Sequence, residues 1–269
     1  LSDLSAQKLR TTLTILGITW GTVAVIVLMA FGVGFEKQTR KNMHGMGDGI
    51  VIMFGGRTTA AYQGYNEGRP IRLREDDVTL IATRVREVGE ISPEYRRGGI
   101  PARVDTLSTM PAVTGVHPIY GDIRNILVED GGRFLNDLDE SGRRRVVVLG
   151  DEIKTLLFGD RDALHQQIML GNVPFTVIGV MAPKTQESSY GSRDTERVFI
   201  PASTHRAVFG DQYLANIVFK PVDASLADPA KQAVREVLGS RYRFDPADTD
   251  AISMWDTSEL DKMLDAIFL

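Results

Sequence analysis

The sequence predicts an α+β protein in which one N-terminal transmembrane helix precedes a larger mixed domain. The first observation is an uncharged run of twenty-three residues, 13–35. As a helix it would extend roughly 35 Å, enough to cross a bilayer core of about 30 Å. The second is that more than 230 mostly polar residues follow, with apolar residues at both strand and helix spacing. The third is their order, because segments of mixed character flank a middle stretch of short strands.

Two alternatives to a membrane span fit the apolar run less well. A signal peptide has an apolar region of about 7–15 residues before a small-residue cleavage site. This run is longer, and Phe35, Glu36 and Lys37 form no such site. A helix buried in a soluble core is usually shorter and carries a polar stripe, whereas only three threonines interrupt this one. We therefore expect a single membrane span.

The numbers of basic residues on the two sides of the span are nearly equal, so the positive-inside rule alone does not set its orientation. A long domain can cross the membrane regardless of nearby charge, and we therefore expect residues 1–12 in the cytoplasm and the large domain outside it. The basic residues are Lys8 and Arg10 before the span and Lys37, Arg40 and Lys41 after it.

The segment after the span predicts a stalk followed by a strand–helix–strand unit. Helical spacing continues beyond the membrane until glycines end it, so residues 36–49 are interpreted as a stalk. The expected helix of the unit has an acidic first turn, which favours the helix dipole. In order, we expect a strand at 50–54, an exposed loop at 57–69, a helix at 74–88 and, after a turn at 90–93, another extended segment.

The middle of the chain, 106–201, alternates short apolar runs with Gly, Pro and Asp turns, which predicts a β-rich region. One helix is expected within it, at 151–158. The arginine run 143–145 is interpreted as a solvated loop leading into a strand rather than an anion site. The expected strands are 112–119, 122–128, 145–149, 167–170, 175–181 and 197–200.

The last third returns to mixed character and echoes the first unit. It predicts a strand at 215–220, a helix at 227–238 that ends at Gly239, and an extended piece from Tyr242. Residues 257–268 place apolar side chains at helical spacing, which predicts an amphipathic helix running back toward the membrane. The chain begins without methionine and stops within that pattern, so we expect a piece of a larger protein.

Composition narrows the class of protein. The chain is 43% hydrophobic and 25% charged, which is ordinary globular usage. Its net charge of −4 argues against a nucleic-acid-binding surface, which normally needs a basic patch. It contains no cysteine, which excludes disulfides, thiolate metal sites and cysteine nucleophiles.

No motif for catalysis is found, so we expect no enzyme activity, cofactor or metal, and substrate-binding residues stay unknown. A phosphate loop is absent. Gly45, Gly47 and Gly49 have no preceding strand and favour a hinge over a dinucleotide site. The segment 202–205 lacks a nucleophile elbow, so Ser203 or Thr204 is expected to cap a helix. The histidines His44, His117, His165 and His205 lie far apart in sequence, and the acidic pairs Asp76-Asp77, Asp139-Glu140 and Asp248/Asp250 are interpreted as helix starts and turns.

Several segments, taken in order, resemble the MacB-like permeases of ABC transporters. Residues 8–18 (KLRTTLTILGI) resemble the family's first transmembrane helix, and 111–120 (PAVTGVHPIY) precede Gly132-Arg133-Phe134, which matches most of its G-R-F-F motif with Leu135 in the last position. The family's Gly-Lys after Leu-Phe-Gly is absent here, where 162–166 reads DALHQ. The later matches are 146–150 (VVVLG), 157–159 (LFG), 175–180 (FTVIGV) and 199–201 (FIP).

The resemblance implies a division of the chain into a Porter-like α/β subdomain and an inserted β-rich, Sabre-like subdomain. A return helix would lead to a missing second span, and the family's FtsX-like segment would also be missing. The implied boundaries are a cytoplasmic segment 1–12, a transmembrane helix 13–35, a stalk 36–49, Porter-like 50–105 and 213–255, Sabre-like 106–212, and a return helix 256–269.

The resemblance also implies function. The chain would be a fragment of the permease of an efflux or export system in the cell (inner) membrane, with its large domain periplasmic. Its expected partners are a second permease copy, as a homo- or heterodimer, a cytoplasmic ATPase that hydrolyses ATP, and membrane lipid, with a periplasmic adaptor or outer-membrane partner as an optional component and no nucleic acid. The alternative is a single-pass membrane-anchored extracytoplasmic binding or sensor module. A third interpretation, a membrane-anchored hydrolase, is not supported, because the sequence offers no recognisable nucleophile and base for it.

Overall fold

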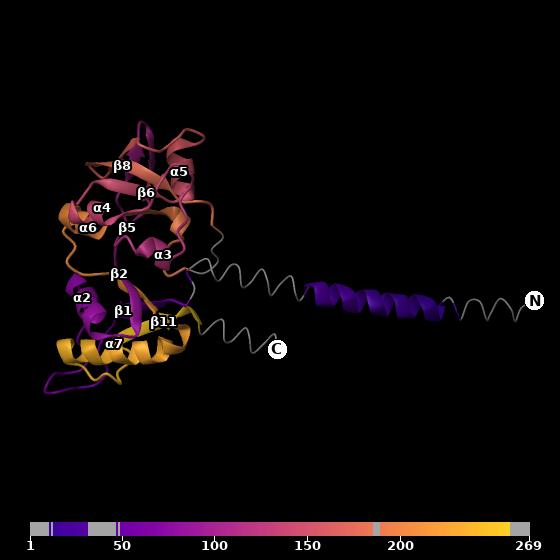
Figure 1. The fold of residues 1–269 in the computed structure, drawn as a ribbon, viewed down its shortest axis with the longest axis horizontal. Coiled ribbons are helices and arrows are strands. Elements are labelled where there is room, and N and C mark those ends of the chain that lie inside the picture. Colours follow the sequence, from indigo (N-terminus) through magenta and orange to yellow (C-terminus); the bar gives the residue numbers. More distant parts are fainter. Residues whose placement is uncertain (1–10, 12, 32–46, 48, 185–188, 259–269) are drawn as a thin grey trace, which may run out of the picture.

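A single mixed sheet organises the large domain of this computed structural model, which describes residues 11, 13–31, 47, 49–184 and 189–258 (Figure 1). The strand order is β11-β1-β10-β2-β5-β9-β6-β8-β7-β3-β4. In chain order the strands are β1 Val51–Gly55, β2 Val88–Arg97, β3 Ala102–Val104, β4 Leu107–Thr109, β5 Ala112–Val116, β6 Val146–Leu149, β7 Gln167–Leu170, β8 Val173–Val180, β9 Arg197–Pro201, β10 Asn216–Pro221 and β11 Ile252–Asp256.

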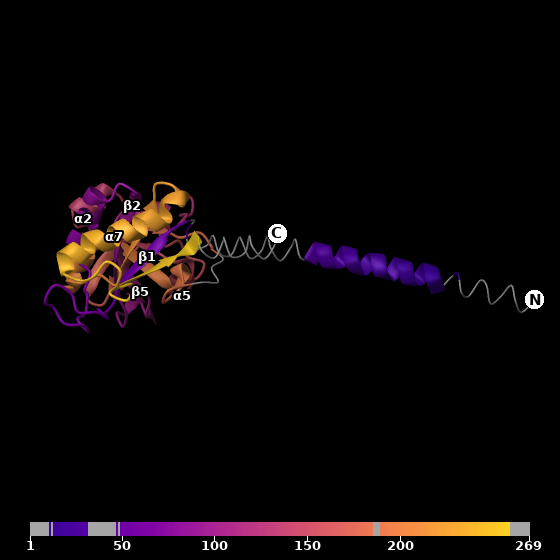
Figure 2. The ribbon, with the colours of Figure 1, turned by 90° about the horizontal axis from the view of Figure 1, so that it is seen from below.

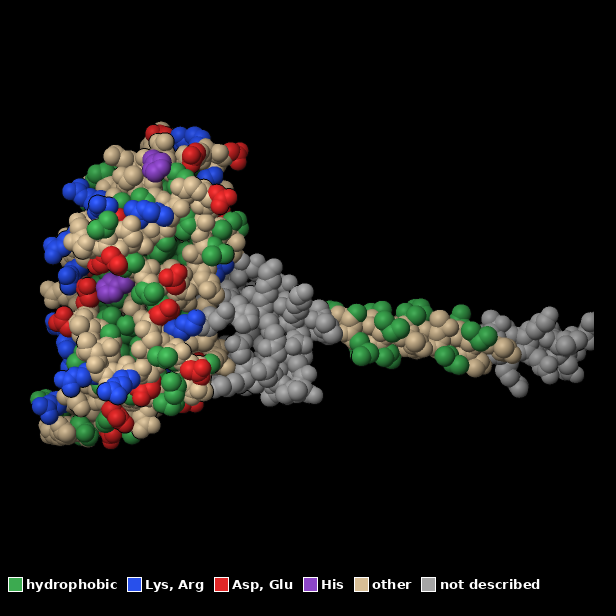
Figure 3. Space-filling view, in the orientation of Figure 1, with side chains coloured by type: hydrophobic (Ala, Val, Ile, Leu, Met, Phe, Trp, Pro, Cys, Tyr) green, Lys and Arg blue, Asp and Glu red, His purple; other side chains and the backbone are tan. Residues whose placement is uncertain are grey.

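Seven α-helical segments are described besides short 3-10 turns. The first, Leu13–Phe31, is 19 residues long with a mean hydropathy of 2.2, so it is long and apolar enough to cross a membrane. Its surface carries hydrophobic and no charged side chains (Figure 3). Residues 32–35 of the expected span and 36–46 of the expected stalk lie outside the described residues. The others are α2 Glu75–Arg84, α3 Tyr120–Ile123, α4 Asp137–Ser141, α5 Asp151–Phe158, α6 Ala202–Phe209 and α7 Ala227–Tyr242.

The lower half in Figure 1 consists of β11, β1, β10 and β2 with α2 and α7 on one face. Seen from below, α7 lies across these strands with α2 beside it (Figure 2). The two predicted strand–helix–strand units are interleaved here, because β1 of the first unit pairs with both β10 and β11 of the second. Val51 and Met53 of β1 point into the core under the helices, as period-two alternation requires.

The upper half consists of the other seven strands with α4, α5 and α6, around a second apolar core. Strands β2 and β5 join the halves, pairing antiparallel from Glu94↔Val116 to Arg97↔Val113. A third core fills the joint and includes Ile50, Ile52 and Tyr120. The predicted α+β class with one N-terminal apolar helix is confirmed, whereas the proposed subdomain boundaries remain a prediction across one unbroken sheet.

Several expected elements need correction. Residues 122–128 form no strand, because Tyr120–Ile123 is a helical turn and Ile123 and Ile126, three residues apart, both reach the core. Helix α7 passes Gly239 and ends at Tyr242, so no strand starts there. A Cβ on Gly239 would lie 2.9 Å from the Phe244 oxygen, which explains a glycine inside the helix. Helix α2 ends at Arg84, earlier than 88, since Val88 already belongs to β2.

Candidate functional site at the joint of the sheet

The chain enters and leaves the domain through neighbouring strands. Because β1 and β11 are antiparallel, the start of β1 lies beside the end of β11. Thr257 N donates to the Ile50 oxygen at 3.0 Å, and Ile50 N donates to Thr257 Oγ1 at 3.1 Å. Asp256 accepts a hydrogen bond from Ser258 N at 2.9 Å, as an N-cap does. Thr257 and Ser258 are helical, and the rest of the expected return helix lies outside the described residues.

Before β1 the chain rests against α3. Gly47 has φ +105, and a Cβ there would lie 2.3 Å from the backbone oxygen of Ile123. Only glycine adopts this backbone conformation readily, and only glycine leaves room for that oxygen. The entering chain therefore packs against Ile123, whose neighbour Arg124 belongs to a buried ionic network.

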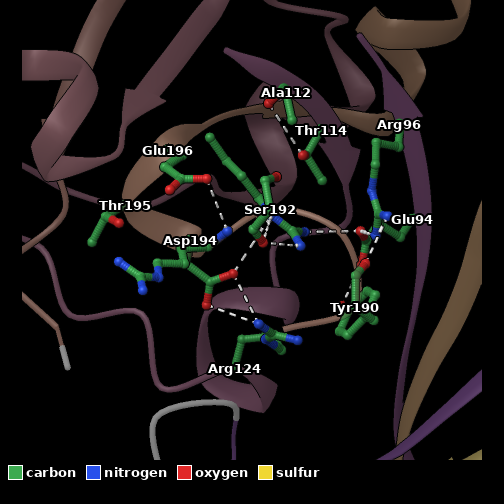
Figure 4. Close-up of polar contacts among 12 residues, drawn as sticks. Glu94, Arg96, Ala112, Thr114, Arg124, Tyr190, Ser192, Asp194, Thr195 and Glu196 are labelled. Carbon is green, nitrogen blue, oxygen red and sulfur yellow. Dashed lines mark hydrogen bonds and ion pairs between the residues drawn. The ribbon is translucent and has the colours of Figure 1, made fainter. Parts of the chain in front are cut away.

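Glu94 of β2 is the centre of this network and is fully buried (Figure 4). One carboxylate oxygen accepts hydrogen bonds from Arg96, at 2.5 Å, and from Arg197, at 3.0 Å. The other accepts from Tyr190 at 2.6 Å and from two further donors, Tyr120 Oη at 2.9 Å and Asn216 Nδ2 at 3.0 Å. Five donors thus surround one carboxylate at the strand that joins the two halves.

Asp194 is the second carboxylate of the network and is also fully buried. Arg124 Nη2 donates to both of its oxygens, at 2.8 and 2.9 Å. Lys184 Nζ lies 3.2 Å from Asp194 Oδ2 and donates to the Arg124 carbonyl at 2.6 Å. Arg197 connects the two carboxylates, since its Nε lies 3.8 Å from Asp194 while its Nη1 binds Glu94.

The Tyr190 ring fills the space between the guanidinium groups. The guanidinium carbons of Arg124, Arg96 and Arg197 lie 5.0, 5.1 and 5.3 Å from its centre. Cations near a ring face are attracted to its π electrons, and more strongly where water is excluded. Nε and Nη1 of Arg124 are buried and have no hydrogen-bond partner among the described residues. The contact with the Tyr190 ring offsets part of the cost of burying this charged group.

The electrostatics keep the network ionised. Burial by itself raises the pKa of Glu94, but attraction by Arg197 and Arg96 outweighs it and lowers that pKa to about 2. Burial likewise raises the pKa of Asp194, and the charges of Arg124 and Lys184 lower it overall. Burial lowers the pKa of Lys184 more than Asp194 raises it. The two ionised carboxylates therefore pair with the guanidinium groups of Arg96, Arg124 and Arg197 at the joint, and the amino group of Lys184 lies beside Asp194.

The sequence did not reveal this network, because its members lie up to 122 residues apart and each occurs in an unremarkable local pattern. The residues that were considered for catalysis lie elsewhere. His205 is buried and stacks on Tyr95, with ring centres 5.3 Å apart. Ser203 and Thr204 do not cap α6, because the helix starts at Ala202, and Ser203 Oγ instead donates to the Glu140 carbonyl.

The acidic pairs lie at helix starts and turns, as predicted. Asp77 and Asp139 are the third residues of α2 and α4, and each accepts a hydrogen bond from the backbone N–H at the start of its helix. Asp248 accepts from Thr59 N at 2.6 Å in the loop before β11. The arginines at 143–145 are exposed.

Comparison with known proteins gives one consistent family. The model of the MacB-like periplasmic core domain matches residues 11–237. The macrolide export ATP-binding/permease protein MacB of Chlorobaculum tepidum is 29% identical over 268 residues, which cover 98% of this chain and 40% of that protein. Its namesake in Neisseria gonorrhoeae is 30% identical over 238 residues, covering 88% and 36%. The chain thus spans about two fifths of the curated relatives it matches.

Solved structures show the same fold. The periplasmic region of MacB from Actinobacillus actinomycetemcomitans superposes with a TM-score of 0.63 at 19% identity, covering 84% of this chain and 96% of that one. The extracellular domain of the noncanonic ABC-type transporter YknZ from Gram-positive bacteria gives 0.62 at 18% identity, covering 77% and 99%.

Proposed function

Because this chain belongs to the family of MacB-like periplasmic core domains, we propose that it is the membrane-anchored extracytoplasmic part of an ABC-type permease. In this proposal ATP is hydrolysed by a separate cytoplasmic subunit or domain, and the chain itself is not an enzyme. A second permease copy completes the assembly in the cell membrane. The helix Leu13–Phe31 anchors the chain in that membrane. Movement that begins at the membrane reaches the large domain through the segments that enter it before β1 and leave it after β11.

The observation that carries this proposal is the continuous path from the base of the domain to its joint. The entering and leaving segments are bonded to each other at Ile50 and Thr257. The entering segment then packs, through Gly47, against Ile123 of α3. Arg124, the next residue, is fully buried and bonded to Asp194 in the upper half. A displacement of the base is therefore passed to both halves.

The ionic network is suited to transmit a rigid-body motion rather than to absorb it. Separating a buried ion pair leaves uncompensated charge, which typically costs about 3–5 kcal/mol. Bending between β2 and β5 would separate Glu94 from Arg197, and shifting α3 would separate Arg124 from Asp194. We propose that the two halves move together when the base moves, so that the upper half pushes or hands over substrate outside the membrane.

The alternative of an anchored binding or sensor module needs no return path to the membrane. Thr257 and Ser258 follow β11 beside the point where the chain enters β1. Entry and exit at the same end of the sheet support the permease proposal.

The test uses the full-length permease with its ATPase. We expect Arg124→Gln to reduce substrate export strongly while ATP hydrolysis persists, because the motor remains intact. Arg161→Gln is the matched control: its ion pair with Asp105, at 3.2 Å, is exposed and lies away from the joint. If Arg124→Gln assembles normally and exports at the wild-type rate, the network stabilises the fold but does not couple motion.

A further inference from the structure

Three potential metal ligands meet at the joint of the sheet, apart from the ionic network. Glu75 begins α2 in the lower half, His117 follows β5, and Glu140 belongs to α4 in the upper half. Each offers one ligand atom, and these atoms all lie within 4.8 Å of one another. The side chains are half-buried, so the position is sheltered but accessible to an ion.

Each carboxylate has one oxygen that accepts a hydrogen bond and a second that accepts none within hydrogen-bond distance among the described residues. Glu75 Oε2 accepts from Tyr95 Oη at 3.0 Å and pairs with Arg206 Nη1 at 2.8 Å. Its Oε1 faces His117 Nε2 at 3.7 Å, which is within ion-pair distance but longer than a hydrogen bond, so these two ligand atoms already point toward each other.

Glu140 shows the same arrangement from the other half of the sheet. Its Oε1 accepts from Ser203 N at 2.9 Å, whereas Oε2 is buried with no hydrogen-bond partner among the described residues. Leaving a buried carboxylate oxygen without a donor is costly, and a bound cation would remove that cost. Outer contacts of this kind fix the direction of metal ligands.

The donor set matches zinc. One imidazole nitrogen and two carboxylate oxygens are common Zn²⁺ ligands at about 2.0–2.2 Å, with water in the fourth position. Calcium and magnesium prefer oxygen ligands alone. We propose that Glu75, His117 and Glu140 bind one Zn²⁺, which ties α2 to α4 across the joint. Tetrahedral ligands at such distances from zinc lie roughly 3.5 Å apart, so these ligand atoms, which lie within 4.8 Å of one another, must draw closer on binding. Arg206, the cation paired with Glu75, offsets part of the carboxylate charge.

The experiment measures Zn²⁺ binding to the full 269-residue chain in detergent, after affinity tags and bound metal have been removed. Titration against a zinc-sensitive dye should give one saturable site per chain. His117→Gln and Glu140→Gln should each weaken it at least about tenfold. Glu140→Gln keeps an oxygen for the Ser203 N–H, so it retains that fold contact. Glu129→Gln, at an exposed carboxylate outside the cluster, is the matched control and should bind like wild type.

X-ray absorption at the zinc edge of the wild-type chain tests the same proposal without any substitution. It should show a single imidazole with oxygen ligands. A spectrum with two or more imidazoles, the absence of saturable binding, or equal binding by all variants would overturn the assignment.

Discussion

Thr257 uses both its backbone and its side chain to hold Ile50, from opposite ends of the domain sequence. Its N–H donates to the Ile50 oxygen at 3.0 Å, and its Oγ1 accepts from Ile50 N at 3.1 Å and lies 3.2 Å from that same oxygen. These bonds close the sheet where the chain enters and leaves.

Thr257→Val should therefore destabilise the domain by about 1–3 kcal/mol, because it leaves the buried Ile50 N–H without a partner. Urea unfolding of the chain in detergent, followed by tryptophan fluorescence, measures the loss. Thr79→Val, at an exposed position of α2, should change stability by less than about 0.5 kcal/mol. Equal effects of the two substitutions would show that the Thr257 bonds contribute nothing particular.

Gly47→Ala and Gly49→Ala form a second matched pair. Both glycines have positive φ, but only at position 47 would the added Cβ collide with backbone, 2.3 Å from the Ile123 oxygen. At position 49 it meets nothing within 4 Å. In the full-length permease we expect Gly47→Ala to lower the export rate more than Gly49→Ala does. Alanine at position 49 should destabilise the domain only by the strain of a left-handed residue, about 1–2 kcal/mol. The reverse ranking would contradict the packing of Gly47 on α3 as the point of transmission.

His205 should make stability depend on pH in a defined window. Burial lowers the pKa of its imidazole to about 4, with Asp211 raising it and Arg97 lowering it more weakly. The unfolded chain binds a proton below about pH 6.5, whereas the folded chain does so only near 4. The free energy of unfolding should thus fall as pH drops from 6.5 to 4, by up to about 3 kcal/mol.

The check is the slope of stability against pH, measured with a metal chelator present. His205→Leu should flatten it between pH 6.5 and 4. His165→Asn is the control, because His165 is exposed and asparagine tolerates its left-handed backbone, with φ +62. A slope that His205→Leu leaves unchanged would assign the dependence to other groups.

The side of the membrane can be read from one engineered thiol. The chain has no cysteine, and Ser141 is exposed at the end of α4. In intact spheroplasts, an impermeant thiol reagent should label Ser141→Cys if the large domain lies outside the cytoplasm, as we propose. Labelling only after lysis would reverse the proposed orientation.

Sequence patterns predicted the local elements well where the spacing of apolar residues is clear. The helix Asp151–Phe158 and the strand Gln167–Leu170 were predicted to the residue. The patterns failed where distant contacts decide. Gly239 was interpreted as the end of a helix, but it lies inside α7. Its lack of a side chain leaves room for the backbone oxygen of Phe244, which packs against the helix there.

The sites escaped prediction for a related reason. Glu94 reads as an ordinary polar residue of a strand until the fold brings Arg197 and Tyr190 to it. His117 and Glu140 are likewise separated in sequence, and only the joint of the sheet places them together.

The interleaving of the two strand–helix–strand units has a consequence for biosynthesis. Strand β1 lies between β10 and β11, whose residues are made roughly 160 or more positions later. At about 5–20 residues per second, β1 waits roughly ten seconds or longer for either neighbour. During that time both of its edges are open to foreign strands. The nascent domain therefore depends on being kept apart from other unfinished copies until its last strand has emerged.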